Sequence, residues 1–369
     1  MHLKEGSSLQ GGKYRIVRFI GSGGFGCTYE AEHVMLRKRV AVKEFFVKDF
    51  CNRDEETAFV TVGTTTKKGL ISKLKQKFID EARSIFVFHH PGIVRVTDVF
   101  EENGTAYYVM DYIEGKSLKE IVDEEGALSE SRALGYIRQV ADALEYVHAH
   151  NRLHLDIKPG NIMIDSNGHA VLIDFGTSKQ YDEVNGENTS TLLGHTAGYA
   201  PPEQVGNDLV KFTPATDIYA LGATLYKLLS GVTPISSTLR NSGDKLAPLP
   251  KSIRISTCKT VDSAMKLNRH ERIQDIITFQ NRLFNICYVK DHISNTSGNN
   301  KHIQEQSTLI DNFYEYSKYN NIKNDKSTSS LNEKLKFAYR QQNEITGKFG
   351  FIDETNKITT VPLKSEKVL

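Results

Sequence analysis

Residues 153–176 read LHLDIKPGNIMIDSNGHAVLIDFG. Two short apolar runs lie on either side of a turn at Asn167-Gly168, and this pattern predicts a β-hairpin. Acidic, basic and amide side chains stand before the hairpin, and Asp174 follows it. We therefore expect a strand–turn–strand unit with polar groups at both of its ends.

Phosphoryl transfer from ATP needs this set of side chains in this order. One carboxylate accepts or orients the proton of the acceptor hydroxyl, and Asp156 is the candidate. A lysine, here Lys158, balances charge on the moving phosphoryl group. Asn161 and Asp174 offer the oxygen ligands that Mg²⁺ prefers. The spacing of these four residues points to an ATP-dependent phosphotransferase.

This segment resembles the catalytic loop and the metal-binding loop of protein kinases. The likeness runs from about Tyr14 to about Phe284 and is closest to the eukaryotic-like serine/threonine kinases of bacteria. It implies an α+β, bilobal fold: a small antiparallel β-sheet N-lobe with one helix, then a mainly α-helical C-lobe. It also implies ATP and Mg²⁺ as cofactors, with Mn²⁺ as an alternative metal, and Ser or Thr hydroxyls of protein substrates as acceptors.

The N-terminal part carries elements that, in this family, cover the phosphates of ATP. A strand-like run precedes a glycine-rich turn, and a second run contains VAVK at residues 40–43. Glycines let backbone N–H groups approach phosphates because no Cβ stands in the way. The resemblance assigns Lys43 to the α- and β-phosphates. The residues that it assigns to nucleotide binding are Ile20, Gly21, Ser22, Gly23, Gly24, Phe25, Gly26, Thr28, Ala41, Lys43, Met110, Asp111 and Ile113.

Two further residues take catalytic roles by resemblance. Apolar residues at helical spacing from Leu70 to Phe88 predict the N-lobe helix. Glu81 in this helix is expected to pair with Lys43, and Asp80 is the alternative. Thr196 matches the threonine that hydrogen-bonds the catalytic aspartate and lysine in serine/threonine kinases.

The chain departs from the family pattern at Leu155, where these kinases commonly have arginine. That arginine grips a phosphate on the activation segment, which here is expected at residues 177–203. Leucine cannot do so, and activity is therefore expected to depend little on phosphorylation of this segment. Two structural contacts are expected by resemblance: Glu203 should pair with Arg272, and Asp217 should hold the backbone of the catalytic loop.

The likeness also divides the chain into domains. The kinase domain is expected at residues 14–287, with the N-lobe at about 14–111 and the C-lobe at about 115–287. An insert at residues 45–68 is longer than the usual connection and predicts a small extra hairpin or an ordered loop on the N-lobe. A role in packing is favoured for it over regulation or docking of a partner.

The composition changes after Cys287. Residues 288–346 are rich in Asn, Ser, Lys and Tyr, which predicts a polar linker. Residues 347–353 read GKFGFID and resemble one unit of the short WG β-repeat, with Phe349 in place of tryptophan. The segment 347–369 is therefore a candidate degenerate repeat and docking element, with a chance match as the alternative.

Composition limits the other classes of function. The net charge of +2 over 369 residues does not favour binding to nucleic acid. No apolar run is long enough to span a membrane, and the four cysteines include no close pair, so a cytoplasmic protein is expected. Two other functions stay open: a pseudokinase that serves as a nucleotide-binding scaffold, and a kinase-like phosphotransferase that acts on small molecules.

Overall fold

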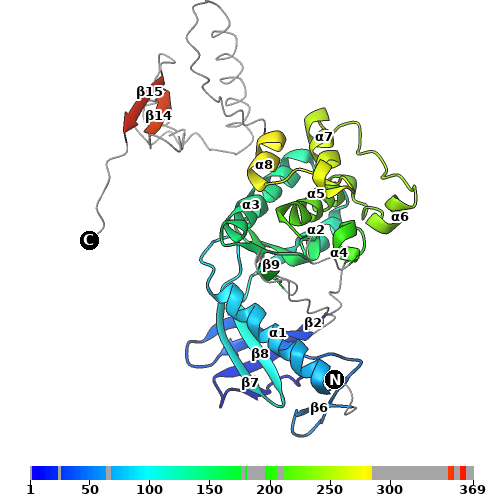
Figure 1. Ribbon diagram of the computed structural model, residues 1–369. Coiled ribbons are helices and arrows are strands. Elements are labelled where there is room, and N and C mark those ends of the chain that lie inside the picture. Colours follow the sequence, from blue (N-terminus) through cyan, green and yellow to red (C-terminus); the bar gives the residue numbers. More distant parts are fainter. Residues whose placement is uncertain are drawn as a thin grey trace, which may run out of the picture. The chain divides into compact units, whose positions relative to one another are not determined.

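The computed structural model describes residues 2–23, 26–63, 68–175, 196–206 and 212–284, and the backbone of residues 179–180, 348–352 and 358–362. The chain divides into two units, residues 1–297 and 298–369, which are described separately. The first unit has an antiparallel sheet in its N-terminal part and a mainly helical C-terminal part (Figure 1). This architecture is the bilobal α+β fold that the sequence predicted.

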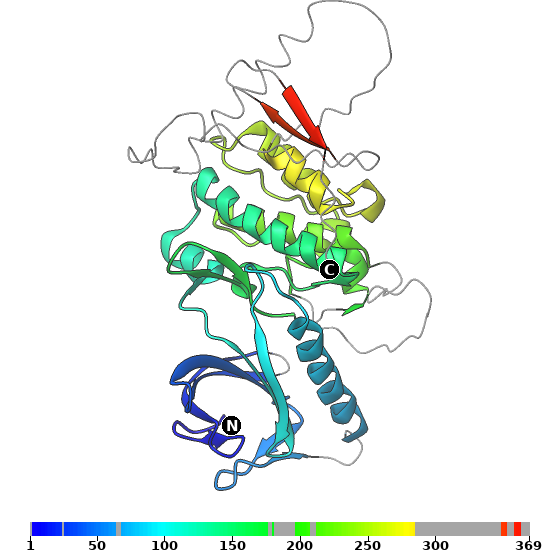
Figure 2. The ribbon, with the colours of Figure 1, turned by 90° about the vertical axis from the view of Figure 1, so that its left-hand side faces the viewer.

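The N-lobe is built on a sheet whose order, among the described residues, is β1-β2-β3-β4-β8-β7. Its strands are β1 (Ser8–Leu9), β2 (Tyr14–Ser22), β3 (Gly26–His33), β4 (Lys38–Phe45), β7 (Val96–Glu102) and β8 (Thr105–Asp111). Helix α1 (Lys68–Phe86) packs against β7 and β8 (Figures 1 and 2). Its buried residues include Phe78, Ala82 and Ile85. The helix begins and ends slightly before the predicted range, because apolar spacing marks a buried face and not the last hydrogen bond.

The first residues of the chain belong to this lobe, although the sequence placed its start at Tyr14. Strand β1 pairs with β2 through Leu9 and Tyr14. Leu3 and Leu9 are buried, and the Leu3 backbone N–H donates to the Tyr29 hydroxyl at 3.1 Å. Two isolated leucines in a polar stretch show no periodicity, so the pattern could not reveal this extension.

The insert forms the predicted hairpin, from β5 (Cys51–Arg53) and β6 (Val60–Val62). A buried ion pair joins it to the main sheet: the Arg53 guanidinium lies 2.6 Å from the carboxylate of Glu44, and the two side chains are 4% and 0% exposed. The Tyr29 hydroxyl donates to the same carboxylate at 2.7 Å. At the other end, the Val60 N–H donates to the Asn103 carbonyl at 2.7 Å. The insert is therefore a packed part of the N-lobe.

The C-lobe surrounds a buried helix, α5 (Pro214–Ser230), which has apolar residues on most of its circumference. Helices α3 (Glu130–Ala149) and α7 (Ile255–Ala264) pack against it. The remaining helices are α2 (Leu118–Glu125), α4 (Pro202–Val205), α6 (Ser237–Asn241) and α8 (Ile276–Phe284). None of the described helices combines the length and apolar character needed to cross a membrane.

Residues 162–172 form the expected hairpin, from β11 (Ile162–Asp165) and β12 (Ala170–Leu172). A third strand, β9 (Gly115–Ser117), pairs with β11 just after the connection between the lobes. A Cβ atom on Gly115 would lie 1.9 Å from the Ile164 carbonyl oxygen, so this close pairing requires glycine. The paired strands therefore hold in place the loop that precedes the hairpin and Asp174, which follows it.

In the second unit, β14 (Lys348–Ile352) pairs with β15 (Ile358–Pro362) in antiparallel register. Strand β14 lies within the GKFGFID motif, and β15 lies within the rest of the candidate segment 347–369. The assignment to a WG-like repeat stays a prediction. The expected linker, 288–346, lies outside the described residues.

Candidate active site

Asp156 lies at the centre of a cluster with three other predicted catalytic residues. Its Oδ2 accepts hydrogen bonds from Lys158 Nζ at 2.7 Å and from Asn161 Nδ2 at 2.8 Å, and its Oδ1 accepts one from the Thr196 hydroxyl at 3.1 Å. Lys158 Nζ also donates to Thr196 Oγ1 at 2.9 Å. Thr196 lies 40 residues further along the chain, so only the fold brings it here. The Asp156 carboxylate is thereby held in one orientation by three donors.

A second cluster forms around Lys43 on β4. Its Nζ lies 2.8 Å from Asp174 Oδ1 and 3.5 Å from Glu81 Oε1. Burial by itself would lower the pKa of the Lys43 ammonium, but the charges of Asp174 and Glu81 outweigh it and raise this pKa well above its ordinary value. Asp80, the alternative partner, is instead exposed and pairs with Arg83 at 3.2 Å. The structure therefore places a permanent positive charge beside Asp174.

Tyr108 supports this cluster, and the sequence analysis did not identify it. It lies opposite Lys43 in the β4–β8 pairing, and its hydroxyl donates to Glu81 Oε1 at 3.1 Å. The Lys43 ammonium lies 5.5 Å from the centre of its ring. Nearly every residue of β8 is buried, so no alternation in the sequence singles out Tyr108. Only its position opposite Lys43 in the paired strands identifies Tyr108 as part of the cluster.

The residues assigned to nucleotide binding lie on one run of neighbouring strands. The end of β2 carries Ile20, Gly21 and Ser22, and Gly23 follows it. The start of β3 carries Gly26 and Thr28, and β4 carries Ala41 and Lys43. The end of β8 carries Met110 and Asp111, and Ile113 lies shortly after it. Gly24 and Phe25 lie outside the described residues. Ala41 and Met110 are direct partners across β4 and β8. A Cβ on Gly26 would lie 2.2 Å from the Glu44 carbonyl oxygen, so the close approach of β3 to β4 at this position requires glycine.

Asn161 and Asp174 have the chemistry of an Mg²⁺ site. Asn161 Nδ2 donates to both the backbone carbonyl and the carboxylate of Asp156, at 2.9 and 2.8 Å, so its amide oxygen is the atom it can offer to a cation. The Asp174 side chain is 33% exposed, which leaves it accessible from solvent. Among the described residues, no cluster of three or more His, Cys, Asp or Glu side chains could hold a metal alone. This donor set fits Mg²⁺, which binds through one or two carboxylates together with substrate phosphates.

Asp217, on α5, anchors the backbone of the catalytic loop. Its carboxylate accepts hydrogen bonds from the backbone N–H groups of His154, at 2.9 Å, and Leu155, at 2.7 Å. His148 Nε2 lies 2.8 Å from the same carboxylate. Burial by itself would raise the pKa of Asp217, but the hydrogen bond and charge of His148 outweigh it and lower this pKa. Asp217 is thus an ionised buried anchor, as the resemblance implied.

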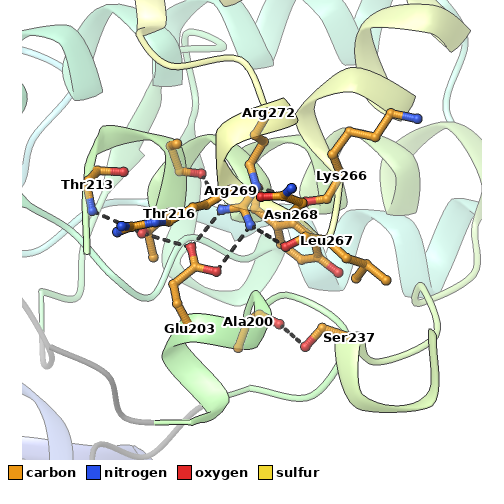
Figure 3. Close-up of polar contacts among 12 residues, drawn as sticks. Ala200, Glu203, Thr213, Thr216, Ser237, Lys266, Leu267, Asn268, Arg269 and Arg272 are labelled. Atoms are coloured by element: carbon orange, nitrogen blue, oxygen red, sulfur yellow. Dashed lines mark hydrogen bonds and ion pairs between the residues drawn. The ribbon is translucent and has the colours of Figure 1, made fainter. Parts of the chain in front are cut away.

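The predicted contact between Glu203 and Arg272 is a buried bidentate ion pair. Its two N–O distances are 2.7 and 3.1 Å (Figure 3). The Thr216 hydroxyl donates to the same carboxylate at 3.1 Å, and the guanidinium also donates to backbone carbonyls, including that of Leu267. Helix α4 is therefore fixed to the start of α5.

Comparison with known proteins gives the same family. Residues 14–285 match the family described as "Protein kinase domain". "Serine/threonine-protein kinase PrkC" of Bacillus subtilis is 35% identical over 223 residues, which cover 60% of this chain and 31% of that protein. "Serine/threonine-protein kinase PknA" of Mycobacterium tuberculosis is 36% identical over 231 residues, covering 61% and 48%. The chain thus spans less than half the length of these relatives.

A solved structure titled "PpkA-294 apo form" superimposes with a TM-score of 0.67 at 30% identity, covering 76% of this chain and 99% of that one. The match to the family extends over most of the chain and includes the catalytic loop, the paired lysine and the two lobes. The chain therefore belongs to the protein kinase family.

Proposed function

We propose that this chain is a serine/threonine protein kinase that transfers the γ-phosphoryl group of Mg-ATP to protein hydroxyls. The arrangement of Asp156, Lys158 and Thr196 carries the proposal. Asp156 accepts from both of the others, and Lys158 reaches both Asp156 and Thr196. A hydroxyl that approaches Asp156 would meet a carboxylate of fixed orientation beside a cation, which is the arrangement needed to orient a nucleophile in phosphoryl transfer.

Each side chain has a distinct task in this proposal. Asp156 orients the acceptor hydroxyl and takes its proton, and Lys158 stabilises charge on the phosphoryl group in transit. Lys43 binds the α- and β-phosphates, and Glu81 holds its ammonium in place. Asn161 and Asp174 would hold the metal ion, which would neutralise charge on the phosphate oxygens. Catalysis then rests on positioning and electrostatics, with no covalent enzyme intermediate.

The names of the relatives support Ser/Thr acceptors in proteins. The choice of Mg²⁺ over another divalent ion, a cytoplasmic location, and docking of partners through residues 45–68 or the C-terminal segment stay predictions.

The test is to incubate the purified chain with Mg-ATP and candidate proteins and to map new phosphosites by mass spectrometry. Asp156→Asn keeps the shape of the side chain but loses the proton acceptor, so turnover should fall by roughly two to four orders of magnitude with Mg-ATP affinity nearly unchanged. Asp174→Asn should weaken Mg-dependent nucleotide binding as well. Equal loss of Mg-ATP affinity in both variants would show that these roles are wrong. Nucleotide binding by the wild-type chain without any turnover would support a scaffold instead.

A further inference from the structure

The residue just before the catalytic aspartate has a strained backbone. Leu155 has a φ of 65°, in the left-handed region, where the Cβ of a leucine crowds the backbone. The residue is only 2% exposed. Such a conformation persists only where surrounding groups hold it, and it is found disproportionately at functional sites. The groups that hold Leu155 therefore bear directly on how Asp156 is oriented.

Two side chains hold the Leu155 backbone from different helices. Its N–H donates to Asp217 on α5, as described above, and its carbonyl accepts a hydrogen bond of 2.6 Å from Gln204 Nε2. Gln204 lies on α4 and is 3% exposed. It shares a small recess with Asp156 and Thr196. The first contact is expected from the family resemblance, but neither the resemblance nor the catalytic cluster accounts for the second.

The second contact links the catalytic loop to the chain that follows Thr196. Helix α4 begins a few residues after Thr196 and is fixed in turn by the Glu203–Arg272 ion pair. The Leu155 side chain packs with Leu153 in a separate small apolar cluster. The hydrogen bond from Gln204 to the Leu155 carbonyl joins two uncharged groups and requires no phosphate.

We propose that Gln204 is a positioning residue for phosphoryl transfer: by holding the Leu155 carbonyl, it maintains the strained backbone that directs the Asp156 carboxylate. This inference rests on the proposed kinase function. In this proposal Gln204 acts through the Leu155 backbone. Its loss should therefore lower kcat and leave the affinity for ATP unchanged.

The first test is Gln204→Leu, which removes the donor and keeps most of the volume. An unpaired buried carbonyl should permit the loop to shift, with an expected fall in kcat of about ten-fold and a change in KM for ATP of less than about two-fold. The matched control is Gln139→Leu. Gln139 also binds backbone groups, the Ala170 N–H at 2.9 Å and the Gly168 carbonyl at 3.3 Å, at the distant end of the β11–β12 hairpin. A kcat within two-fold of wild type for Gln204→Leu, or an equal loss in the control, would overturn the proposal.

The second test uses pH. In Gln204→Glu, burial should raise the pKa of the new carboxyl above the ordinary value for glutamate. Below that pKa the neutral acid can donate to the Leu155 carbonyl, and above it the carboxylate repels the same oxygen. The ratio of kcat for this variant to that of wild type should therefore fall as pH rises, while the ratio for Gln204→Leu stays flat. A flat ratio for both variants would contradict a role as hydrogen-bond donor.

A third measurement does not depend on activity. Amide hydrogen exchange should be faster in residues 153–161 of Gln204→Leu than in wild type, and unchanged there in Gln139→Leu. If the wild-type chain transfers no phosphate, the proposed function fails, but exchange still decides whether Gln204 holds the loop. Unchanged exchange in Gln204→Leu would refute that role by itself.

Discussion

The substitution Arg53→Met tests whether the insert is part of the folded N-lobe. It removes the guanidinium that lies 2.6 Å from Glu44 and keeps an unbranched apolar stem. Both side chains are almost fully buried, so the Glu44 carboxylate would be left without its cation inside the protein. Breaking a buried pair in this way costs about 3–5 kcal/mol. For a domain of this size the melting temperature should fall by about 6–20 °C.

The matched control is Arg18→Met. Arg18 pairs with Glu30 at 2.8 Å on the same sheet, but its side chain is 53% exposed. The Glu30 side chain is only 9% exposed, but Arg39 stays 3.9 Å from its carboxylate when Arg18 is lost. Arg18→Met should therefore cost only about 0–1 kcal/mol, as for a pair at the protein surface. The two variants therefore differ in burial and share the chemistry of the lost contact. Thermal and urea unfolding, followed by circular dichroism, measure both.

A double variant separates two effects of Arg53→Met: the loss of the contact with Glu44 and the burial of an unpaired Glu44 carboxylate. Glu44→Gln in the Arg53→Met background removes the buried charge, and the new amide oxygen can still accept from the Tyr29 hydroxyl. The double variant should therefore be more stable than Arg53→Met alone. The reasoning is wrong if Arg53→Met lowers the melting temperature no more than Arg18→Met, or if adding Glu44→Gln lowers it further.

Three other substitutions test the site and its support. Lys43→Met should abolish most phosphotransfer in a folded protein, because the phosphates lose their buried cation; a radiolabelled ATP assay that shows unchanged activity would mean that another lysine fills the role. Alanine at all three hydroxyl residues of 189–191 should keep most activity, because Leu155 cannot bind a phosphate; a collapse of kcat would defeat this. Arg272→Met should lower stability to urea by about 3–5 kcal/mol, because it strands the buried Glu203 carboxylate, and a loss below 1 kcal/mol would argue against that burial.

The candidate catalytic residues could be selected from sequence because phosphoryl transfer restricts their types and order. Asp156, Lys158 and Asn161 stand on one short loop, so the spacing of a single segment carries their relation. The hairpin after that loop was predictable for a similar reason, since strand alternation and turn residues are local signals. The extra hairpin of the insert was also predictable from sequence, but the buried ion pair that joins it to the main sheet was not.

The tertiary structure decided the contacts that join distant segments. Tyr108 reaches Glu81 through strand register, Arg53 reaches Glu44 across two sheets, and Gln204 reaches Leu155 across 49 residues. Such contacts depend on where whole elements pack, and a tyrosine, arginine or glutamine carries no local sign of its partner. Local sequence therefore indicated which groups are candidates for the chemistry, and the family resemblance indicated some of their supports. Packing determined the further supports Tyr108, Arg53 and Gln204, because burial, which removes competing water, gives these hydrogen bonds and ion pairs their strength.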